Sequence, residues 1–241
     1  MVTACDRIDI IRFLEGTVSE YWEGDEHSFG VFVDTHYGYY LNRVYGVRVE
    51  HCNHVSPLFY TFQDVGIDSK IVDTYPYKEQ KKSPKKRELL YQGDSLKESE
   101  LVDLFEGGEK WFEASNDVIS EQADHIVSTI PNKRERQRLT CEILLKESEV
   151  TTCLVRERKN ARLIISEKMS KVSNAQSVTE NPSIRVNANS YYYALNAAKR
   201  LTDVTFYVER SKKLLVRGTL RKNDDTESEV VVVIALNKGR I

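Results

Sequence analysis

Apolar residues recur along this chain at two different spacings, and each spacing predicts a different kind of element. In residues 6–22 they stand three and four positions apart, which is typical of a helix that packs on one face, and Asp6 can cap its start. Three later segments are dense in Val, Tyr and Phe and are interrupted by Gly, which predicts antiparallel strands. These segments span residues 27–50, 57–65 and 69–77.

A polar segment comes next. KEQKKSPKK, within the basic stretch 78–87, has no apolar residue to bury, and we interpret it as a surface loop. A strand is predicted at 87–94 and a helix at 95–108, because Ser95 and Glu98 form a capping box at the helix start.

Two strands are predicted next, at 110–117 and 118–130, with a tight turn at Asn116-Asp117. A strand at 137–144 and a helix at 145–160 follow. A strand-turn-strand arrangement over 150–166 is a serious alternative to that helix, because its paired Thr residues disfavour helix.

The closing part of the chain has the clearest pattern. It predicts one strand, one helix and then three strands, with Asn189 or Ser190 as the helix cap. These elements span residues 183–188, 189–201, 203–211, 214–222 and 229–237.

The motif LKESE occurs twice, at 96–100 and at 145–149, in places that look equivalent in this order of elements. Internal repeats indicate duplicated units. We therefore predict an α+β fold of two similar domains, 1–130 and 131–241, each with antiparallel sheets and two short helices.

Composition excludes some classes of protein. The chain has 241 residues and a formal net charge of -2, with 40% hydrophobic and 30% charged residues, as in ordinary globular proteins. No apolar run is long enough to cross a membrane, and no secretion signal is recognisable at the start. The four cysteines are scattered, so we expect reduced thiols in a cytoplasmic compartment.

Three stretches, 6–34, 96–130 and 183–237, resemble the helices and strands of DNA polymerase sliding clamps, above all the trimeric clamps of T4-type phages, archaea and eukaryotes. The resemblance implies a homotrimeric ring of viral or archaeal character, with strands outside and helices around duplex DNA. It implies a non-catalytic processivity factor without cofactor, which tethers a DNA polymerase and is opened by an ATP-driven clamp loader. It would act in the cytoplasm, or in the host cytoplasm if viral.

A sliding ring needs attraction to phosphates without fixed base contacts, and therefore Lys and Arg on its helices. Each such residue, taken singly, is also ordinary on a solvated helix. The DNA-binding candidates on the four predicted helices are Arg7, Arg12, Lys97, Lys146, Arg156, Arg158, Lys159, Lys199 and Arg200.

The resemblance also implies a groove for partner peptides near the connector at 128–137 and the C-terminal segment. Ile130, Leu236 and Ile241 are the candidate contacts, and ordinary core packing explains them equally well.

Other chemistries are weaker. The stretch HCNH at 51–54 could bind a metal with His27 and His36, but adjacent strand residues point to opposite faces. The stretch 16–50 faintly resembles the opening barrel strands of staphylococcal-nuclease-like domains, which gives an alternative hypothesis centred on residues 12–60. In that alternative Asp25 and Asp34 would bind calcium and Arg43 phosphate, yet Arg48 stands where that family has a carboxylate. A viral structural or accessory protein is a further alternative. Among Tyr191, Tyr192 and Tyr193, which could stack on bases, we expect Tyr193 in the core and one of the other two at its rim.

Overall fold

The computed structural model divides the chain into two compact units, Met1–Leu104 with Arg221–Val231 and Phe105–Leu220 with Val232–Ile241. The predicted domain boundary at residue 130 is a separate expectation and stays a prediction. The structure describes Phe13 and residues 28–33, 37–41, 45–50, 58–64, 69–76, 103–159, 161–176, 183–209, 212–221 and 227–237.

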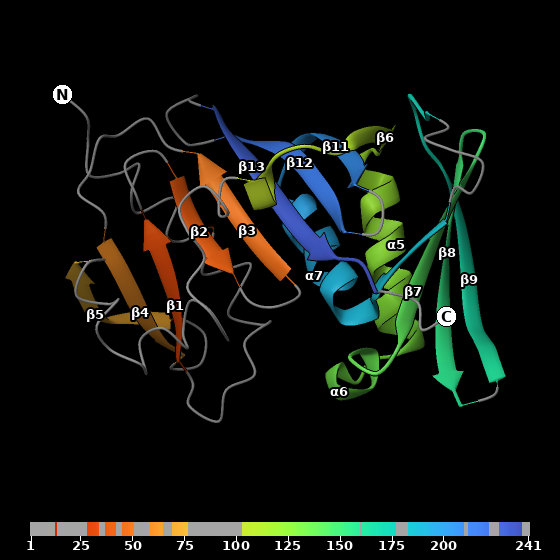
Figure 1. Cartoon of the computed structure of the whole chain (residues 1–241), viewed down its shortest axis with the longest axis horizontal. Coiled ribbons are helices and arrows are strands. Elements are labelled where there is room, and N and C mark those ends of the chain that lie inside the picture. Colours follow the sequence, from red (N-terminus) through yellow and green to blue (C-terminus); the bar gives the residue numbers. More distant parts are fainter. Residues whose placement is uncertain are drawn as a thin grey trace. The chain divides into compact units, whose positions relative to one another are not determined.

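The first unit contains five antiparallel strands in the order β5-β4-β1-β2-β3 (Figure 1). Buried Tyr40, Tyr45 and Val47 belong to its core, which explains why aromatic and β-branched residues are so dense there. The strands predicted for this region are confirmed. They are β1 (Ser28–Val33), β2 (Tyr37–Leu41), β3 (Tyr45–Glu50), β4 (Leu58–Asp64) and β5 (Ser69–Pro76).

Several predictions for the first unit lie outside the described residues. Of the helix predicted at 6–22 only Phe13 is described, and it is helical and buried. The loop 78–87, the strand 87–94 and the capping box also lie outside. The helix predicted at 95–108 is helical at 103–105.

Residues 109–235 contain two copies of one pattern, a strand, a helix and three strands, and their elements belong to the second unit except for Arg221 and the first five residues of β13. A single-turn helix, α6 (Lys133–Arg136), is inserted in the first copy only. The first copy contains β6 (Glu109–Glu113), α5 (Asn116–Thr129), β7 (Thr140–Lys146), β8 (Glu149–Arg158) and β9 (Ala161–Lys171). The second contains β10 (Ser183–Asn187), α7 (Ala188–Ala198), β11 (Thr202–Glu209), β12 (Lys213–Arg221) and β13 (Glu227–Ala235).

The two copies exchange their first strands. β6 pairs with β11 of the second copy, and β10 pairs with β7 of the first, which gives the strand orders β13-β12-β11-β6 and β10-β7-β8-β9. A second segment also pairs with each exchanged strand. The segment after β9 pairs with β6, and the segment after β13 pairs with β10. Glu113 and Ser173 exchange backbone hydrogen bonds beside β6, and the Asn237 N–H donates to the Arg185 carbonyl beside β10.

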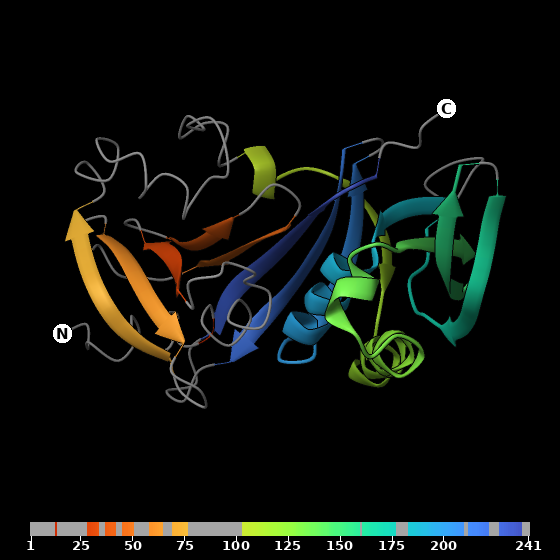
Figure 2. The same cartoon turned by 90° about the horizontal axis from the view of Figure 1, so that it is seen from below.

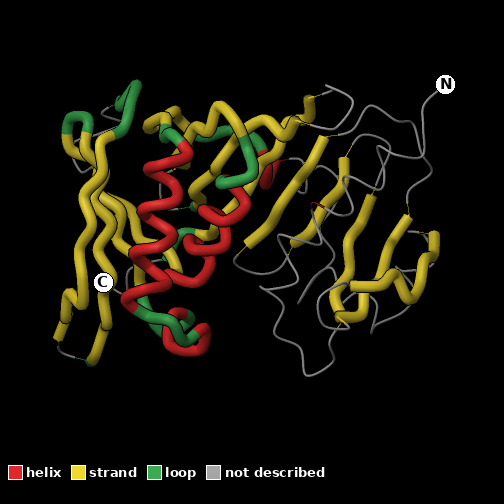
Figure 3. The backbone as a smooth tube through the Cα atoms, turned by 180° about the vertical axis from the view of Figure 1, so that it is seen from behind, coloured by secondary structure: helices red, strands yellow, loops and turns green. Residues whose placement is uncertain are grey.

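Helices α5 and α7 pack against each other and form a layer on one side of these sheets (Figures 1, 2 and 3). Small residues of α7, including Ala194 and Ala198, allow this close approach, and Ile119 and Ile126 of α5 are fully buried. The predicted α+β class is confirmed.

Several predictions in this unit were wrong. The tight turn predicted at Asn116-Asp117 is instead the first turn of α5, and the cap of α7 is Asn187 rather than Asn189 or Ser190. The segment predicted as a strand at 118–130 is part of α5, which Ser115 caps by accepting a hydrogen bond from the Val118 N–H. The helix predicted at 145–160 is absent, because Glu147 takes a positive φ of 56° and turns the chain from β7 into β8. The alternative of strand, turn and strand over 150–166 is confirmed by β8 and β9.

The LKESE motif therefore does not mark the duplication that the structure shows. Its second copy, 145–149, forms the β7–β8 turn rather than the opening of a helix, and its first copy lies outside the described residues. The two repeated patterns lie within residues 109–235.

Candidate nucleic-acid interface

The helix layer carries little positive charge. The exposed face of α5 has three acidic residues, Asp117, Glu121 and Asp124, and no Lys or Arg, whereas α7 has no charged residue at all. Nearby cations partly neutralise the acids. Lys168 Nζ lies 3.3 Å from Glu121 Oε2, and Lys199 Nζ lies 3.0 Å from Asp124 Oδ1.

The structure places the DNA-binding candidates differently from the prediction. Lys199 caps the C-terminal end of α7 and exposed Arg200 follows it, as expected. The four candidates assigned to the third helix lie in the β7–β8–β9 region instead, so that placement was wrong. Those four are Lys146, Arg156, Arg158 and Lys159. Arg7, Arg12 and Lys97 lie outside the described residues, and DNA binding by all nine stays a prediction.

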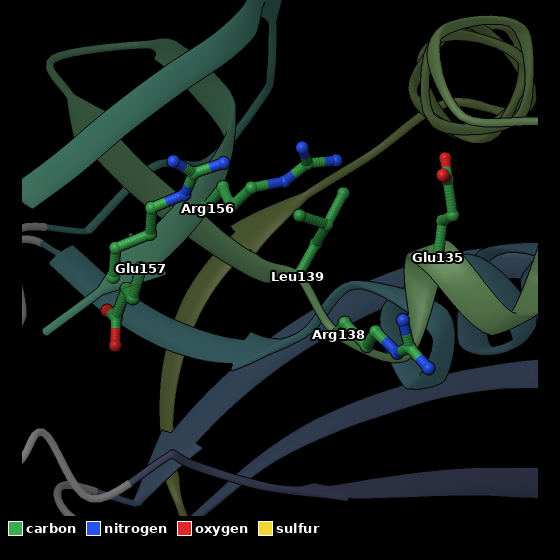
Figure 4. Close-up of a pocket in the computed structure, with 6 residues that line it drawn as sticks. Glu135, Arg138, Leu139, Arg156 and Glu157 are labelled. Atoms are coloured by element: carbon green, nitrogen blue, oxygen red, sulfur yellow. The ribbon is translucent and has the colours of Figure 1, made fainter.

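Two of these candidates line a cavity of about 360 Å³ beyond the ends of the helices. Arg138 joins Arg156 and Arg158 there, and Figure 4 shows side chains from β8 and from the segment after α6 around Leu139. The complete lining is Glu135, Arg138, Leu139, Arg156, Glu157 and Arg158.

Strand alternation places Arg156 and Arg158 on the helix side of their sheet. Leu154 is opposite Ser166 of β9, and the Ser166 hydroxyl lies 3.2 Å from His125 Nε2 on α5. Side chains two residues apart share a face of a strand, so Arg156 and Arg158 continue the face of Leu154. Glu157 points to the other side, where its Oε1 lies 3.4 Å from Arg185 Nη1.

The guanidinium groups around this cavity have few compensating charges. Among the described residues, no carboxylate lies within ion-pair distance of Arg138, Arg156 or Arg158. By contrast, Glu142 on the outer face of the sheet is paired with both Arg162 and Arg185. The arginines of the cavity are therefore available for an anion.

A buried arginine fixes the segment that carries Arg138. Arg136 Nη1 donates to the carbonyls of Ile130 (2.9 Å) and Pro131 (2.7 Å), and its Nε lies 3.4 Å from Asn189 Oδ1 at the start of α7. Its guanidinium also lies over the Tyr192 ring, 4.7 Å from the centroid. The end of α5, α6 and the start of α7 are thus held together by one side chain.

The two described candidates for partner binding, Ile130 and Leu236, contact other residues of this chain. Ile130 is buried and its N–H donates to the Ile126 carbonyl, while Leu236 forms a bridge with Val186. Ile241 lies outside the described residues. Binding of partner peptides by these three stays a prediction.

The residues of the rival chemistries are mainly outside the described part, including the HCNH stretch, His27, His36, Asp25, Asp34 and Arg43. Arg48 is described. It is buried, with Nη2 3.1 Å from Glu229 Oε2 and its guanidinium over Tyr37. In the described ranges no three His, Cys, Asp or Glu residues gather as metal ligands.

The tyrosines and cysteines near α7 belong to the core. Tyr191 and Tyr193 are buried and Tyr192 is partly exposed, which confirms Tyr193 as a core residue and places Tyr192 at the rim. Cys141 and Cys153 are unbridged and buried, and burial raises the pKa of both thiols. None of the described helices is long and apolar enough to cross a membrane.

Sequence comparison gives no relative, since no family model and no curated protein matches the chain. Solved structures do match. The Helicobacter pylori beta clamp, crystallised with carprofen, aligns with a TM-score of 0.57 at 10% identity, over 95% of this chain and 64% of that one. The beta subunit of DNA polymerase III from Pseudomonas aeruginosa aligns with a TM-score of 0.55 at 12% identity, over 97% of this chain and 65% of that one. The beta subunit of DNA polymerase III from Thermotoga maritima aligns with a TM-score of 0.55 at 11% identity, over 100% of this chain and 64% of that one.

The chain thus spans just under two thirds of the length of these clamps. At such low identity the likeness concerns the fold, and it extends over nearly all of this chain. The predicted resemblance is confirmed at that level: this chain has the fold of the DNA sliding clamps.

Proposed function

We propose that this protein is a DNA sliding clamp, a non-catalytic ring that encircles duplex DNA and tethers a polymerase. The observation that carries the proposal is the alignment of nearly the whole chain with bacterial beta clamps. The single helix layer supports it, because a closed ring with that layer inward would enclose DNA without any catalytic group.

Ring formation requires an edge through which copies can join, and β9 is suited to this. It is the last strand of its sheet among the described strands, and it carries three large apolar residues that are half exposed or more: Leu163 (61%), Ile164 (50%) and Met169 (57%). An exposed edge with apolar side chains favours pairing with another chain.

The internal duplication supports the same role for β9. Its counterpart in the second copy is β13, whose first residues, 227–231, belong to the same compact unit as β3 and follow β3 in the strand order. We infer that a strand of a second subunit occupies the equivalent position beside β9. Contacts of this head-to-tail kind give a ring when the rotation from one copy to the next closes, and we propose that it closes after three copies, as a homotrimer.

The proposed partners are duplex DNA, bound without sequence preference, a DNA polymerase and an ATP-driven clamp loader. The proposed place of action is the cytoplasm, or that of the host if the protein is viral. A nuclease-like function has less support, because Arg48, the one described residue of that hypothesis, is buried and paired with Glu229.

Light scattering after size exclusion, followed by primer extension on long primed templates, tests the proposal. We expect about three times the mass of 27.8 kDa and an increase in polymerase product length. Ile164→Glu should reduce the trimer by placing a charge in the joint, whereas Arg221→Glu, on an exposed residue at the end of β12, should not. A protein that stays monomeric at every concentration and never lengthens the product would refute the proposed function.

A further inference from the structure

We propose that the cavity lined by Arg138, Arg156 and Arg158 binds phosphodiester groups of the duplex DNA backbone. This inference rests on the proposed clamp function and deepens it. It identifies where this chain contacts DNA, which the clamp fold alone does not.

The first argument is position. Arg156 and Arg158 lie on the same side of their sheet as α5, because they continue the face of Leu154. In a ring whose helix layer faces inward, this side faces the DNA. Arg138 reaches the same cavity from the segment after α6, which Arg136 holds in place.

The second argument is charge. The lining has three arginines and two glutamates, Glu135 and Glu157, and none of the three guanidinium groups is within ion-pair distance of a carboxylate among the described residues, so the cavity attracts an anion. Arginine presents a planar fork of donors that matches phosphate oxygens in pairs. The carboxylate of Glu157, directed to the other face, compensates Arg185 instead.

The third argument is size. A space of about 360 Å³ exceeds what a single small anion fills, so the cavity can take part of a hydrated DNA backbone. Phosphate contacts of this kind position DNA without reading its bases.

The charge of the helix face supports this location of the DNA contact. The exposed side of α5 has no Lys or Arg of its own to hold phosphates, and its acidic residues are Asp117 together with Glu121 and Asp124, which pair with Lys168 and Lys199. Attraction is concentrated in the arginine cavity beyond the helix ends. Each subunit would then contact the backbone at one end of its helix pair.

Fluorescence anisotropy with the full chain and a short linear duplex, between roughly 50 and 200 mM salt, tests this inference. Loss of two phosphate contacts in the double variant Arg156→Ala/Arg158→Ala should reduce the salt slope by about 1.8. Affinity at low salt should fall roughly tenfold for each contact. The Arg156→Lys/Arg158→Lys variant keeps the charge and should retain the slope while binding more weakly.

Arg221→Ala is the matched control, because it removes an exposed arginine at the end of β12, whose pair with Glu227 is also exposed. Urea unfolding of each variant confirms that the fold is intact. Unchanged affinity and slope in the folded double alanine variant, with wild-type protein that still trimerises and supports processivity, would overturn the cavity assignment alone. Wild-type protein that neither trimerises nor supports processivity would instead refute the clamp function.

A poly-glutamate peptide labelled in the same way separates DNA from an acidic protein as the ligand. Wild-type chain should bind the duplex far more tightly than the peptide. The peptide could instead bind with the same affinity as the duplex, and the double variant Arg156→Ala/Arg158→Ala could lose both ligands equally. That result would assign the cavity to acidic proteins and overturn the DNA inference.

Discussion

The two copies of the repeated pattern share a topology but differ in what they expose. Nine of the eleven residues of α7 are buried and none is charged, whereas four of the fourteen residues of α5 are buried and its outer face is acidic. The last strands differ in the same way. β13 is buried along most of its length, and β9 is exposed over its first four residues. The helix and last strand of the second copy are therefore mostly buried, whereas those of the first copy expose more of their surface.

A matched pair of isoleucines tests this contrast most strongly. Ile234 on β13 is fully buried and Ile164 on β9 is half exposed. Ile234→Ala should lower the free energy of unfolding by about 2–5 kcal/mol, because it leaves a cavity in the core. Ile164→Ala should change it by less than about 0.5 kcal/mol when monomers are compared. Urea unfolding at low protein concentration measures both.

In an assay of the proposed trimer, the two variants should show the opposite order of effect, with Ile164→Ala the more damaging. Ile164→Ala should weaken the trimer and Ile234→Ala should leave it intact wherever the protein is folded. Equal effects of both substitutions on unfolding would show that the copies do not differ as described.

The next largest loss of stability is expected for Arg136, which joins the two copies. Arg136→Ala removes the donor to two carbonyls at the end of α5 and to Asn189, and it should cost about 1.5–3 kcal/mol of stability. Arg136→Lys should recover little, because an ammonium group cannot reproduce the planar fork. Thermal unfolding checks this, with the exposed neighbour Arg134→Ala as control. Full recovery by lysine would contradict the bridging role.

The smallest effect concerns His125, between α5 and β9. Burial, and then the positive charge of Lys168, lower the pKa of His125 below its ordinary value of 6.5. The unfolded chain therefore binds the proton more readily, so stability should be complete above pH 6.5 and should decline as the pH falls from there through the folded pKa. Urea midpoints measured across this range should fall less in His125→Asn than in the wild-type chain. Parallel curves would contradict the assignment.

Much of the fold could be predicted from the sequence, and the failures have physical causes. The strands of the first unit and the elements of the second copy were predicted from β-branched and aromatic runs and from one helix pattern, although the cap of that helix is Asn187 rather than Asn189 or Ser190. α5 was missed because Val118, Ile119 and Ile126 favour strands intrinsically. Their spacing and the Ser115 cap carried the helix signal, and tertiary packing against α7 decides in its favour.

The β7–β8 turn was harder to foresee. LKESE consists of residues that suit helices, and a glutamate at positive φ is uncommon. The pairing of Leu145 with Val150 across the turn depends on the whole β7–β8 ladder, which helix propensity does not contain.

The candidate site was found only in part. Arg156 and Arg158 were named because of an expected helix, and they lie on a strand. Arg138 was not named, although the basic cluster NKRERQR that contains it is conspicuous in the sequence. Its approach to β8 depends on the buried contacts of Arg136, which no spacing rule reveals.

The exchange of β6 and β10 makes each copy depend on the other. A polypeptide with a single copy would have no strand of its own beside its first strand, so that strand could be paired only by a second molecule. The covalent link between the two copies in this chain supplies that partner at every protein concentration.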